Sequence, residues 1–164
     1  MQTLDASLLH RAIALAEEAV ALGRRPFGAV VADAEGRIVA EAGAVATTDI
    51  RDWTAHSEMV ALRAASALRD WDTLAGCTLY ASGEPCPMCA AAVYWCNVRR
   101  VVFGASEGSI RTLRGGFARA AGIEISCREV TQRCPHPIAV KGPCLEAEAL
   151  SAHRAFWPTA AQSV

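Results

Sequence analysis

Apolar residues follow two different periodicities along the chain, and the change from one to the other predicts helices and strands. Over residues 8–20 they recur at helical spacing, with Ser7 or Asp5 as the N-cap and Gly23 as the stop. Similar patterns predict helices at 56–68, 85–95 and 145–156. Short apolar runs between turn residues predict strands at 28–32, 37–42, 77–81, 100–103 and 123–130.

The order of these elements indicates the fold class. After the first helix come two strands, a polar loop at 47–52, and then helices and strands in alternation. Such alternation is typical of a partly parallel sheet that is covered by helices on both faces. No internal repeat, low-complexity segment or linker divides the sequence. We therefore expect one α/β domain over residues 1–164, built as a three-layer α/β/α sandwich.

Composition and charge narrow the possible partners. The chain has 164 residues, of which 52% are hydrophobic and 20% charged, as expected for a globular domain. The formal net charge is −1, and no run of Lys and Arg is longer than two residues. A nucleic-acid partner is therefore not expected, because binding to phosphates usually requires a basic surface.

The sequence also carries signals about the compartment. Residues 1–9 lack the pattern of a secretion signal, and no apolar stretch is long enough to span a bilayer. The seven cysteines are an odd number, and two of them form a Cys-x-x-Cys pair. These features predict reduced thiols, metal binding and a cytoplasmic location, without a membrane partner.

Three potential zinc ligands occur at a characteristic spacing. Cys86 and Cys89 lie at the start of a predicted helix, where both sulfurs face one side and the helix dipole favours the thiolate form. His56 begins an earlier predicted helix, and Glu58 follows two residues later. Three protein ligands leave one position of a tetrahedral zinc open for water, as in catalytic sites. We expect one Zn²⁺ per chain, bound by His56, Cys86 and Cys89.

The combination of His-x-Glu with Pro-Cys-x-x-Cys is the signature of zinc nucleobase deaminases. Zinc in such sites lowers the pKa of its water from about 15.7 to about 7. Glu58 is predicted to accept the water proton, pass it to a ring nitrogen and later protonate the departing amine. Acid–base catalysis of this kind typically contributes about 10²- to 10⁴-fold in rate.

A structural zinc site is the alternative interpretation of the same residues. Its fourth ligand would come from the remaining cysteines or one histidine, namely Cys77, Cys96, Cys127, Cys134, Cys144 or His136. Such a site would not require Glu58, so we favour the catalytic interpretation. Cys134-Pro135-His136 is interpreted as an ordinary turn, and Cys77 and Cys96 as small core side chains.

Several residues are candidates for holding a flat ring. Phe27 lies between Pro26 and Gly28 at the start of a predicted strand, where Gly28 would let a ring approach the backbone. Trp95 and Trp157 are further stacking candidates, although aromatic residues on helices are more often core or subunit contacts. The backbone near Ala55 and Glu84 can hydrogen-bond the edge of the ring.

With these residues identified, residues 26–103 resemble the cytidine and deoxycytidylate deaminase superfamily. Three segments carry the resemblance, namely Pro26-Phe27-Gly28-Ala29-Val30, Thr54-Ala55-His56-Ser57-Glu58 and Glu84-Pro85-Cys86-Pro87-Met88-Cys89. Together with Tyr94-Trp95, they look most like the bacterial guanine deaminase branch. The tRNA adenosine deaminases and the small fungal-type cytosine deaminases are near relatives. The resemblance implies a five-stranded mixed sheet, a homodimer, and a C-terminal segment that closes the pocket. In guanine deaminases that segment is exchanged between subunits, and Phe156-Trp157 resembles its aromatic end.

The sequence departs from the family at two places. An asparagine that holds the base or its sugar is expected about eleven residues before the zinc histidine, but Val45 lies there, and Trp53 replaces a usual proline. We therefore look to Glu146 or Glu148 for recognition of the ring, against the alternative that both lie on a solvated helix face. The expected function is hydrolytic deamination of a free nucleobase or related amino-heterocycle, with a guanine-like ring favoured. A tRNA adenosine deaminase, a cytosine or nucleoside deaminase and a non-enzymatic zinc-binding scaffold are the alternatives.

Overall fold

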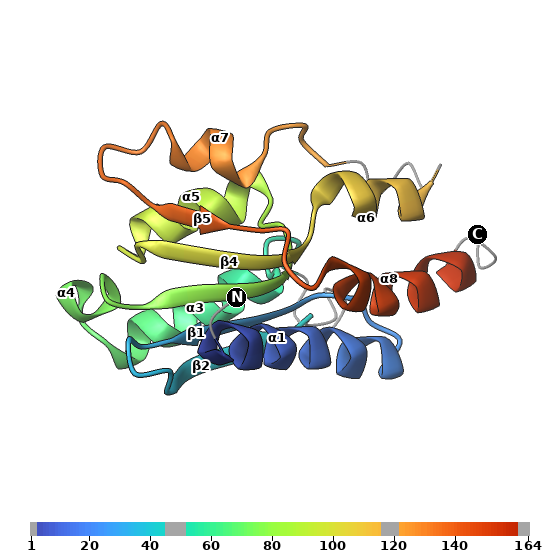
Figure 1. Ribbon diagram of the computed structural model, residues 1–164, viewed down its shortest axis with the longest axis horizontal. Coiled ribbons are helices and arrows are strands. Elements are labelled where there is room, and N and C mark those ends of the chain that lie inside the picture. Colours follow the sequence, from blue (N-terminus) through green and yellow to red (C-terminus); the bar gives the residue numbers. More distant parts are fainter. Residues whose placement is uncertain (1–2, 45–51, 116–121, 161–164) are drawn as a thin grey trace.

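Five strands form one mixed sheet in the order β2-β1-β3-β4-β5 (Figure 1). The computed structural model describes residues 3–44, 52–115 and 122–160 of the chain. The strands are β1 (Gly28–Ala32), β2 (Ile38–Gly43), β3 (Thr78–Gly83), β4 (Arg100–Ala105) and β5 (Ala139–Lys141). β1 pairs antiparallel with both β2 and β3, whereas the β3–β4 and β4–β5 pairs are parallel. The mixed five-stranded sheet is confirmed.

Helices cover both faces of this sheet. They are α1 (Thr3–Ala21), α3 (Ser57–Leu68), α4 (Trp71–Leu74), α5 (Pro87–Trp95), α6 (Glu107–Arg114), α7 (Cys127–Thr131) and α8 (Glu146–Ala160). α1 and α8 pack against one face, and α3 and α5 against the other, with α7 beside α5 (Figure 1). The predicted three-layer α/β/α architecture is therefore confirmed.

Alternating side chains of the central strands build a separate core on each face. Leu79 of β3 and Val101 of β4 pack with α3 and α5, whereas the next residues, Tyr80 and Val102, pack with α1 and α8. The alternation follows from the two-residue period of a strand. Because both faces of β4 are buried, it carries the continuous apolar run Val101-Val102-Phe103, as is typical of central strands that are covered on both sides.

The start of α1 differs from its prediction. The helix begins at Thr3, before both proposed caps, and Asp5 lies within its first turn. The Asp5 side chain is buried and accepts two hydrogen bonds from Arg100, at 2.8 and 2.7 Å. Asp5 therefore anchors α1 to the sheet rather than capping the helix. The predicted end is confirmed, because Gly23 follows the helix with a φ of +69°, a conformation that favours glycine.

Gly28 has a different role from the one predicted. A Cβ on Gly28 would lie 2.3 Å from the carbonyl oxygen of Ala12 and 2.6 Å from Cβ of Leu15. Glycine is therefore required for the close approach of β1 to α1. The prediction that it makes room for a substrate ring is not supported by this geometry.

The strand predicted at 123–130 is wrong. That segment instead leads into α7, whose N-cap Ser126 forms a capping box with Glu129. The fifth strand is the three-residue β5, at 139–141. A local capping signal thus prevailed over the apolar alternation at Ile123 and Ile125.

Three short helices, α4, α6 and α7, were not predicted from the sequence. Of the polar loop at 47–52, only Asp52 belongs to the described part of the chain, and Val45 also lies outside it. Within residues 3–44, 52–115 and 122–160, no helix is both long and apolar enough to cross a membrane.

Candidate active site

The three predicted zinc ligands meet at one point. Cys86 Sγ, Cys89 Sγ and His56 Nδ1 form a triangle in which all three edges are 3.6 Å. A tetrahedral zinc with Zn–S bonds of about 2.3 Å and a Zn–N bond of about 2.0–2.1 Å would separate its ligands by roughly 3.6–3.8 Å. The triangle therefore fits zinc without rearrangement, and its soft sulfur and imidazole ligands suit that metal.

Two helix N-termini bring these ligands together. His56 is the N-cap of α3, and Cys86 is the N-cap of α5, where Pro87 occupies the first helical turn. Cys89 lies one turn further along α5 and is fully buried. α5 follows β3 directly, so the set lies at the carboxyl end of the central parallel strands, where α/β proteins commonly bind ligands.

The electrostatics of the set favour a thiolate. Hydrogen bonding from Cys89, supported by His56, lowers the pKa of the Cys86 thiol to about 4. The contact with Cys86 also raises the pKa of His56. A thiolate is the form of cysteine that binds metal.

No fourth protein ligand accompanies the set within the described ranges. No other His, Cys, Asp or Glu side chain there places a ligand atom within 4.8 Å of all three. The other cysteines and His136 are therefore not ligands in this geometry, and the structural zinc alternative loses its proposed fourth partner. An open position is the arrangement expected of a catalytic zinc.

Glu58 lies beside the ligands but does not join them. Its side chain is 5% exposed and accepts a hydrogen bond of 3.0 Å from Ser57 Oγ. Burial raises the pKa of Glu58, while the charge of His56 opposes this rise. A buried carboxyl group with a raised pKa next to an open metal position is suited to accepting and returning a proton.

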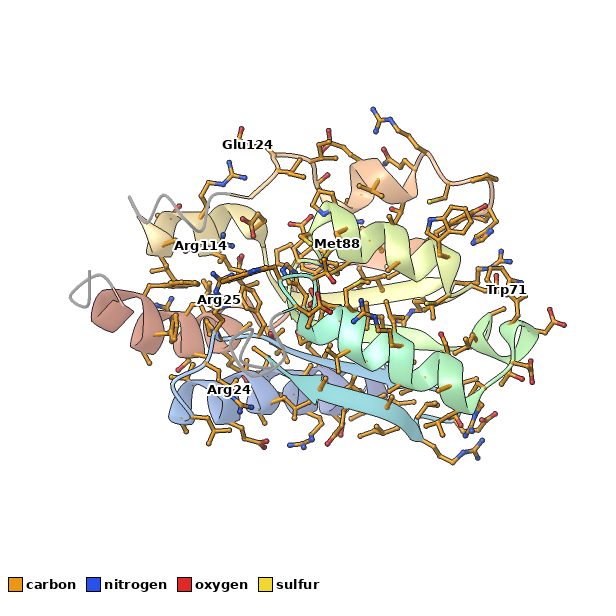
Figure 2. All side chains as sticks on the ribbon, turned by 180° about the vertical axis from the view of Figure 1, so that it is seen from behind. Arg24, Arg25, Trp71, Met88, Arg114 and Glu124 are labelled. Carbon is orange, nitrogen blue, oxygen red and sulfur yellow. The ribbon has the colours of Figure 1, made fainter. Side chains whose placement is uncertain are left out.

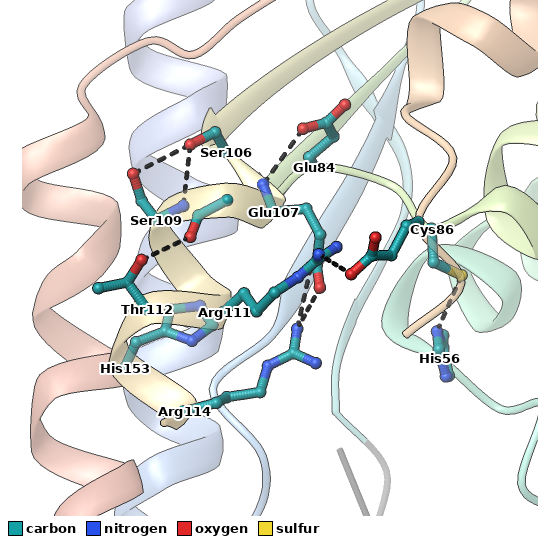
Figure 3. A network of polar contacts seen from close by, with 12 residues as sticks. His56, Glu84, Cys86, Ser106, Glu107, Ser109, Arg111, Thr112, Arg114 and His153 are labelled. Atoms are coloured by element: carbon teal, nitrogen blue, oxygen red, sulfur yellow. Dashed lines mark hydrogen bonds and ion pairs between the residues drawn. The ribbon is translucent and has the colours of Figure 1, made fainter. Parts of the chain in front are cut away.

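A cavity of about 610 Å³ opens onto Glu58 and the ligand set. Its volume is in the range of sites for small organic molecules. α6, α8 and the segment before α7 form the wall opposite α3 and α5. Figure 3 shows His56 and Cys86 on one side of this space and Glu107, Arg111 and Arg114 of α6 on the other.

Four of the predicted substrate contacts line this cavity: Phe27, Ala55, Glu84 and Trp157. The Glu84 carboxylate accepts hydrogen bonds from the backbone N–H groups of Glu107 at 3.2 Å and Cys127 at 3.1 Å. It thus joins the N-termini of α6 and α7. Trp157 donates a hydrogen bond of 3.0 Å from Nε1 to Nδ1 of His153, whose ring also meets Phe27 edge-on.

The other three predicted contacts are not among the lining residues of the described chain. Trp95 is 71% exposed at the far end of α5 from the zinc ligands. Glu146 accepts hydrogen bonds from the backbone and side chain of Ser106, and Glu148 pairs with His10 at the surface. Both glutamates lie at the start of α8, and their carboxylates bind Ser106 before α6 and His10 of α1 rather than line the cavity.

Sequence reasoning missed the charged residues of the cavity. Arg25 precedes β1, whereas Glu107, Arg111 and Arg114 belong to α6, and all four line the space. Figure 2 shows Arg25 and Arg114 at the same end of the molecule and Trp71 at the other. A polar helix directly after a buried strand was the one signal that could have identified α6, because strand ends border such sites.

The remaining cysteines and His136 have structural surroundings. Cys127 is buried below Glu84, and burial raises the pKa of its thiol to about 12. His136 stacks on Tyr94 with ring centroids 4.4 Å apart. Cys134 contacts the carbonyl oxygen of Val130, and the backbone of Cys144 bonds to the end of β4.

Comparison with known proteins agrees with this site. Residues 2–105 match the family model of the cytidine and deoxycytidylate deaminase zinc-binding region. A probable cytosine deaminase of Schizosaccharomyces pombe is 34% identical over 154 residues, which cover 93% of this chain and 92% of that protein. The guanine deaminase of Bacillus subtilis is 43% identical over 102 residues, or 62% of this chain and 64% of the relative.

Solved structures resemble the whole fold. A variant protein in complex with 8-azaguanine has a TM-score of 0.77 and 27% identity, covering 94% of this chain and 86% of that one. A structure from a study of tRNA:A34 deaminases has a TM-score of 0.70 and 28% identity, covering 90% and 99% of the two chains. The relatives are thus named for different substrates, whereas the zinc ligands of this chain all lie within the region that the family model matches. By sequence, fold and metal-ligand geometry, the chain belongs to the cytidine and deoxycytidylate deaminase family, as a zinc-dependent hydrolytic deaminase.

Proposed function

We propose that this protein hydrolytically deaminates a free nucleobase or a related amino-heterocycle and releases ammonia, with a guanine-like ring favoured. The observation that carries this proposal is the cavity itself. Aromatic side chains of Phe27 and Trp157 contribute to its walls, and Glu58 lines it together with two of the zinc ligands, His56 and Cys86. A single flat ring fits such a space, with its amine directed toward Glu58.

The residues have separate roles in the proposed reaction. His56, Cys86 and Cys89 would hold the zinc, which would supply an acidified water as the nucleophile. Glu58 accepts a proton from that water as the new C–O bond forms, and it delivers the proton to a ring nitrogen. Glu58 then takes the second proton from the new hydroxyl group and passes it to the amine as the C–N bond breaks, so that ammonia leaves and the ring keeps an oxo group.

Ring binding in this proposal uses groups on both walls. Phe27 contacts one face of the ring, and Trp157 closes the cavity from α8. The backbone near Ala55 and Glu84 offers hydrogen bonds to the ring edge. An amino-oxo edge that enters the cavity without a partner would lose about 1–3 kcal/mol of binding energy.

Ammonia release from a panel of guanine, cytosine, adenine, pterins and aminotriazines tests the proposal. We expect turnover of at least one amino-oxo ring, and guanine should be among the better substrates. A tRNA stem-loop with adenosine at its wobble position is the necessary comparison, because tRNA adenosine deaminases are among the relatives. Turnover of that RNA together with inactivity on every free ring would contradict the proposal.

We further propose a homodimer that uses the layer of α3, α4 and α5. Three large apolar side chains in this layer are more than half exposed: Leu68, Trp71 and Trp95. Covering such a group by a second copy would remove apolar surface from water. Light scattering should show a mass of twice 17.3 kDa, and Trp95→Glu should shift it toward the monomer.

A cytoplasmic location is part of the proposal, because all seven cysteines are free thiols.

A further inference from the structure

Glu107 and Arg114 of α6 line the cavity on the side opposite His56 and Cys86. Glu107 lies in the first turn of this helix, and Arg114 lies in its last turn. The Arg114 Nη2 donates to both oxygens of the Glu107 carboxylate, at 3.0 and 2.9 Å. Figure 3 shows the pair directed into the space between α6 and the segment that carries Cys86.

This ion pair is, with Asp5–Arg100, among the more deeply buried pairs of the described residues. The side chains of Arg114 and Glu107 are 12% and 26% exposed. Arg11 and Glu18 of α1 have the same seven-residue separation and are 35% and 58% exposed. Removing charges from water costs free energy that the attraction between them often does not recover. The burial of this pair is therefore poorly explained by stability alone.

Both members are held in place by neighbouring groups. The backbone N–H of Glu107 donates to the Glu84 carboxylate, which also bonds to the start of α7. The guanidinium of Arg114 lies over the ring of Trp157, 5.6 Å from its centroid. Side chains that are already fixed in this way favour ligand binding, because little side-chain entropy is lost when the ligand binds.

The chemistry of Glu107 leaves it able to accept from a ligand. An ionised carboxylate has about four lone-pair positions, and each Glu107 oxygen accepts one hydrogen bond from Arg114. Burial raises the pKa of Glu107, whereas the charge of Arg114 opposes this rise. Arg114 thereby helps to keep the carboxylate in its accepting form.

We propose that Glu107 is a specificity-determining residue that accepts a hydrogen bond from an N–H group on the substrate ring, with Arg114 as its positioning residue. The favoured class is a heterocycle with a ring N–H beside a carbonyl group, as in amino-oxo bases. A ring whose edge offers acceptors alone would place a lone pair against the carboxylate and is disfavoured. This inference rests on the proposed function, because it assumes that the cavity holds a free ring.

Binding of 8-azaguanine, measured by calorimetry, tests the assignment without turnover. Glu107→Gln should raise the Kd about tenfold or more, since a hydrogen bond to a charged group is lost. Glu18→Gln is the matched control, because it removes the same charge from an Arg–Glu pair of equal spacing on α1. It should leave the Kd within about twofold. Zinc content and melting temperature are measured on each variant.

Activity provides a second readout that a purely structural role would not change. On a ring that the parent deaminates, Glu107→Gln should raise KM more than it lowers kcat, and Arg114→Lys should give a smaller rise. In Glu107→Ala, the preference for guanine over its N-methylated forms should fall. Loss of this preference in a folded, zinc-loaded variant would show that Glu107 binds the N–H group of the ring, because a purely structural role would not change the preference.

The outcomes separate this inference from the proposed function. If Glu107→Gln binds 8-azaguanine within twofold of the parent, or if Glu18→Gln weakens binding equally, Glu107 does not read the ring. A parent protein that fails to bind the probe also overturns the assignment. If the parent binds 8-azaguanine but releases ammonia from none of the rings, the proposed function fails while the Glu107 result still stands or falls by its own comparison.

Discussion

The two walls of the cavity differ in where their residues come from and in what they do. The wall formed by the starts of α3 and α5 holds His56, Glu58 and Cys86 in two contiguous motifs. The opposite wall is built from α6, α8 and the segment before α7, and its charged and aromatic residues are dispersed over the second half of the chain. The first wall matches the family model, which ends at residue 105, and the second lies beyond that match.

This difference indicates that metal binding and substrate recognition are carried by different walls of the cavity. Zinc binding and proton transfer need a few groups at fixed spacing, so they are carried by short motifs on rigid helix starts. Under the proposed function, substrate choice depends on the shape and charge of the other wall, which can vary without disturbing the metal ligands. Relatives by sequence include proteins named as cytosine, guanine and tRNA adenosine deaminases, in agreement with this division.

The strongest test of the comparison removes the proposed proton carrier, Glu58, from the wall formed by the starts of α3 and α5. Glu58→Gln should lower kcat by about 10²- to 10⁴-fold, because an amide cannot carry the proton between water, ring and amine. The variant should still fold and retain one zinc per chain, measured by metal analysis and thermal melting. Loss of the metal would show instead that Glu58 is a ligand.

A second test changes stability without touching either wall. Asp5 is 5% exposed and is bonded to Arg100, Tyr80 and Lys141. Asp5→Asn should lower the free energy of unfolding by about 2–3 kcal/mol, which allows for solvent at Arg100, whose side chain is 34% exposed. Chemical denaturation measures this loss, and kcat should stay within twofold of the parent.

The pH dependence of that loss checks its cause. The hydrogen bonds from Arg100 hold the pKa of Asp5 well below its ordinary value of 3.8. A depressed carboxyl pKa stabilises the folded state above the unfolded pKa, and the effect disappears as the pH falls toward the folded pKa. The difference between parent and Asp5→Asn should therefore be full above pH 5 and shrink below 3.8. A difference that stayed constant down to pH 3 would point to packing instead of charge.

The smallest expected effect concerns the hydrogen bond that holds Trp157 in the wall formed by α6, α8 and the segment before α7. His153 is buried, and burial lowers its pKa to about 4, so its ring is neutral near pH 7 and accepts the hydrogen bond from Trp157. His153→Phe keeps an aromatic ring but removes this acceptor, at a cost of about 1 kcal/mol. We expect KM for the active ring to rise about fivefold with little change in kcat. His10→Gln at the surface is the control, and an unchanged KM in His153→Phe would show that Trp157 needs no such support.

Much of the fold could be predicted from local pattern. Residues 8–20 show a helical period and lie in α1, because a helix with one buried face repeats its apolar residues. Residues 28–32 form an unbroken apolar run and form β1, because a strand that is buried on both faces requires apolar residues throughout. The strand proposed at 123–130 failed because a four-residue capping signal, Ser126 with Glu129, outweighed the alternation of Ile123 and Ile125. β5 has only three residues and is defined by its pairing with β4, which no local pattern reveals.

The sequence by itself located the metal-ligand triangle of His56, Cys86 and Cys89 and placed Glu58 beside it, because these residues lie within two short motifs whose spacing on helix starts brings them together. It could not determine the opposite wall. Glu146 and Glu148 were reasonable candidates as carboxylates near the C-terminus, yet packing of α8 on α1 and β4 directs them to other partners. Glu107 and Arg114 meet the cavity only because Glu84 holds the start of α6 and Trp157 of α8 closes over its end. That convergence depends on contacts between elements far apart in the chain, so only the tertiary structure decided it.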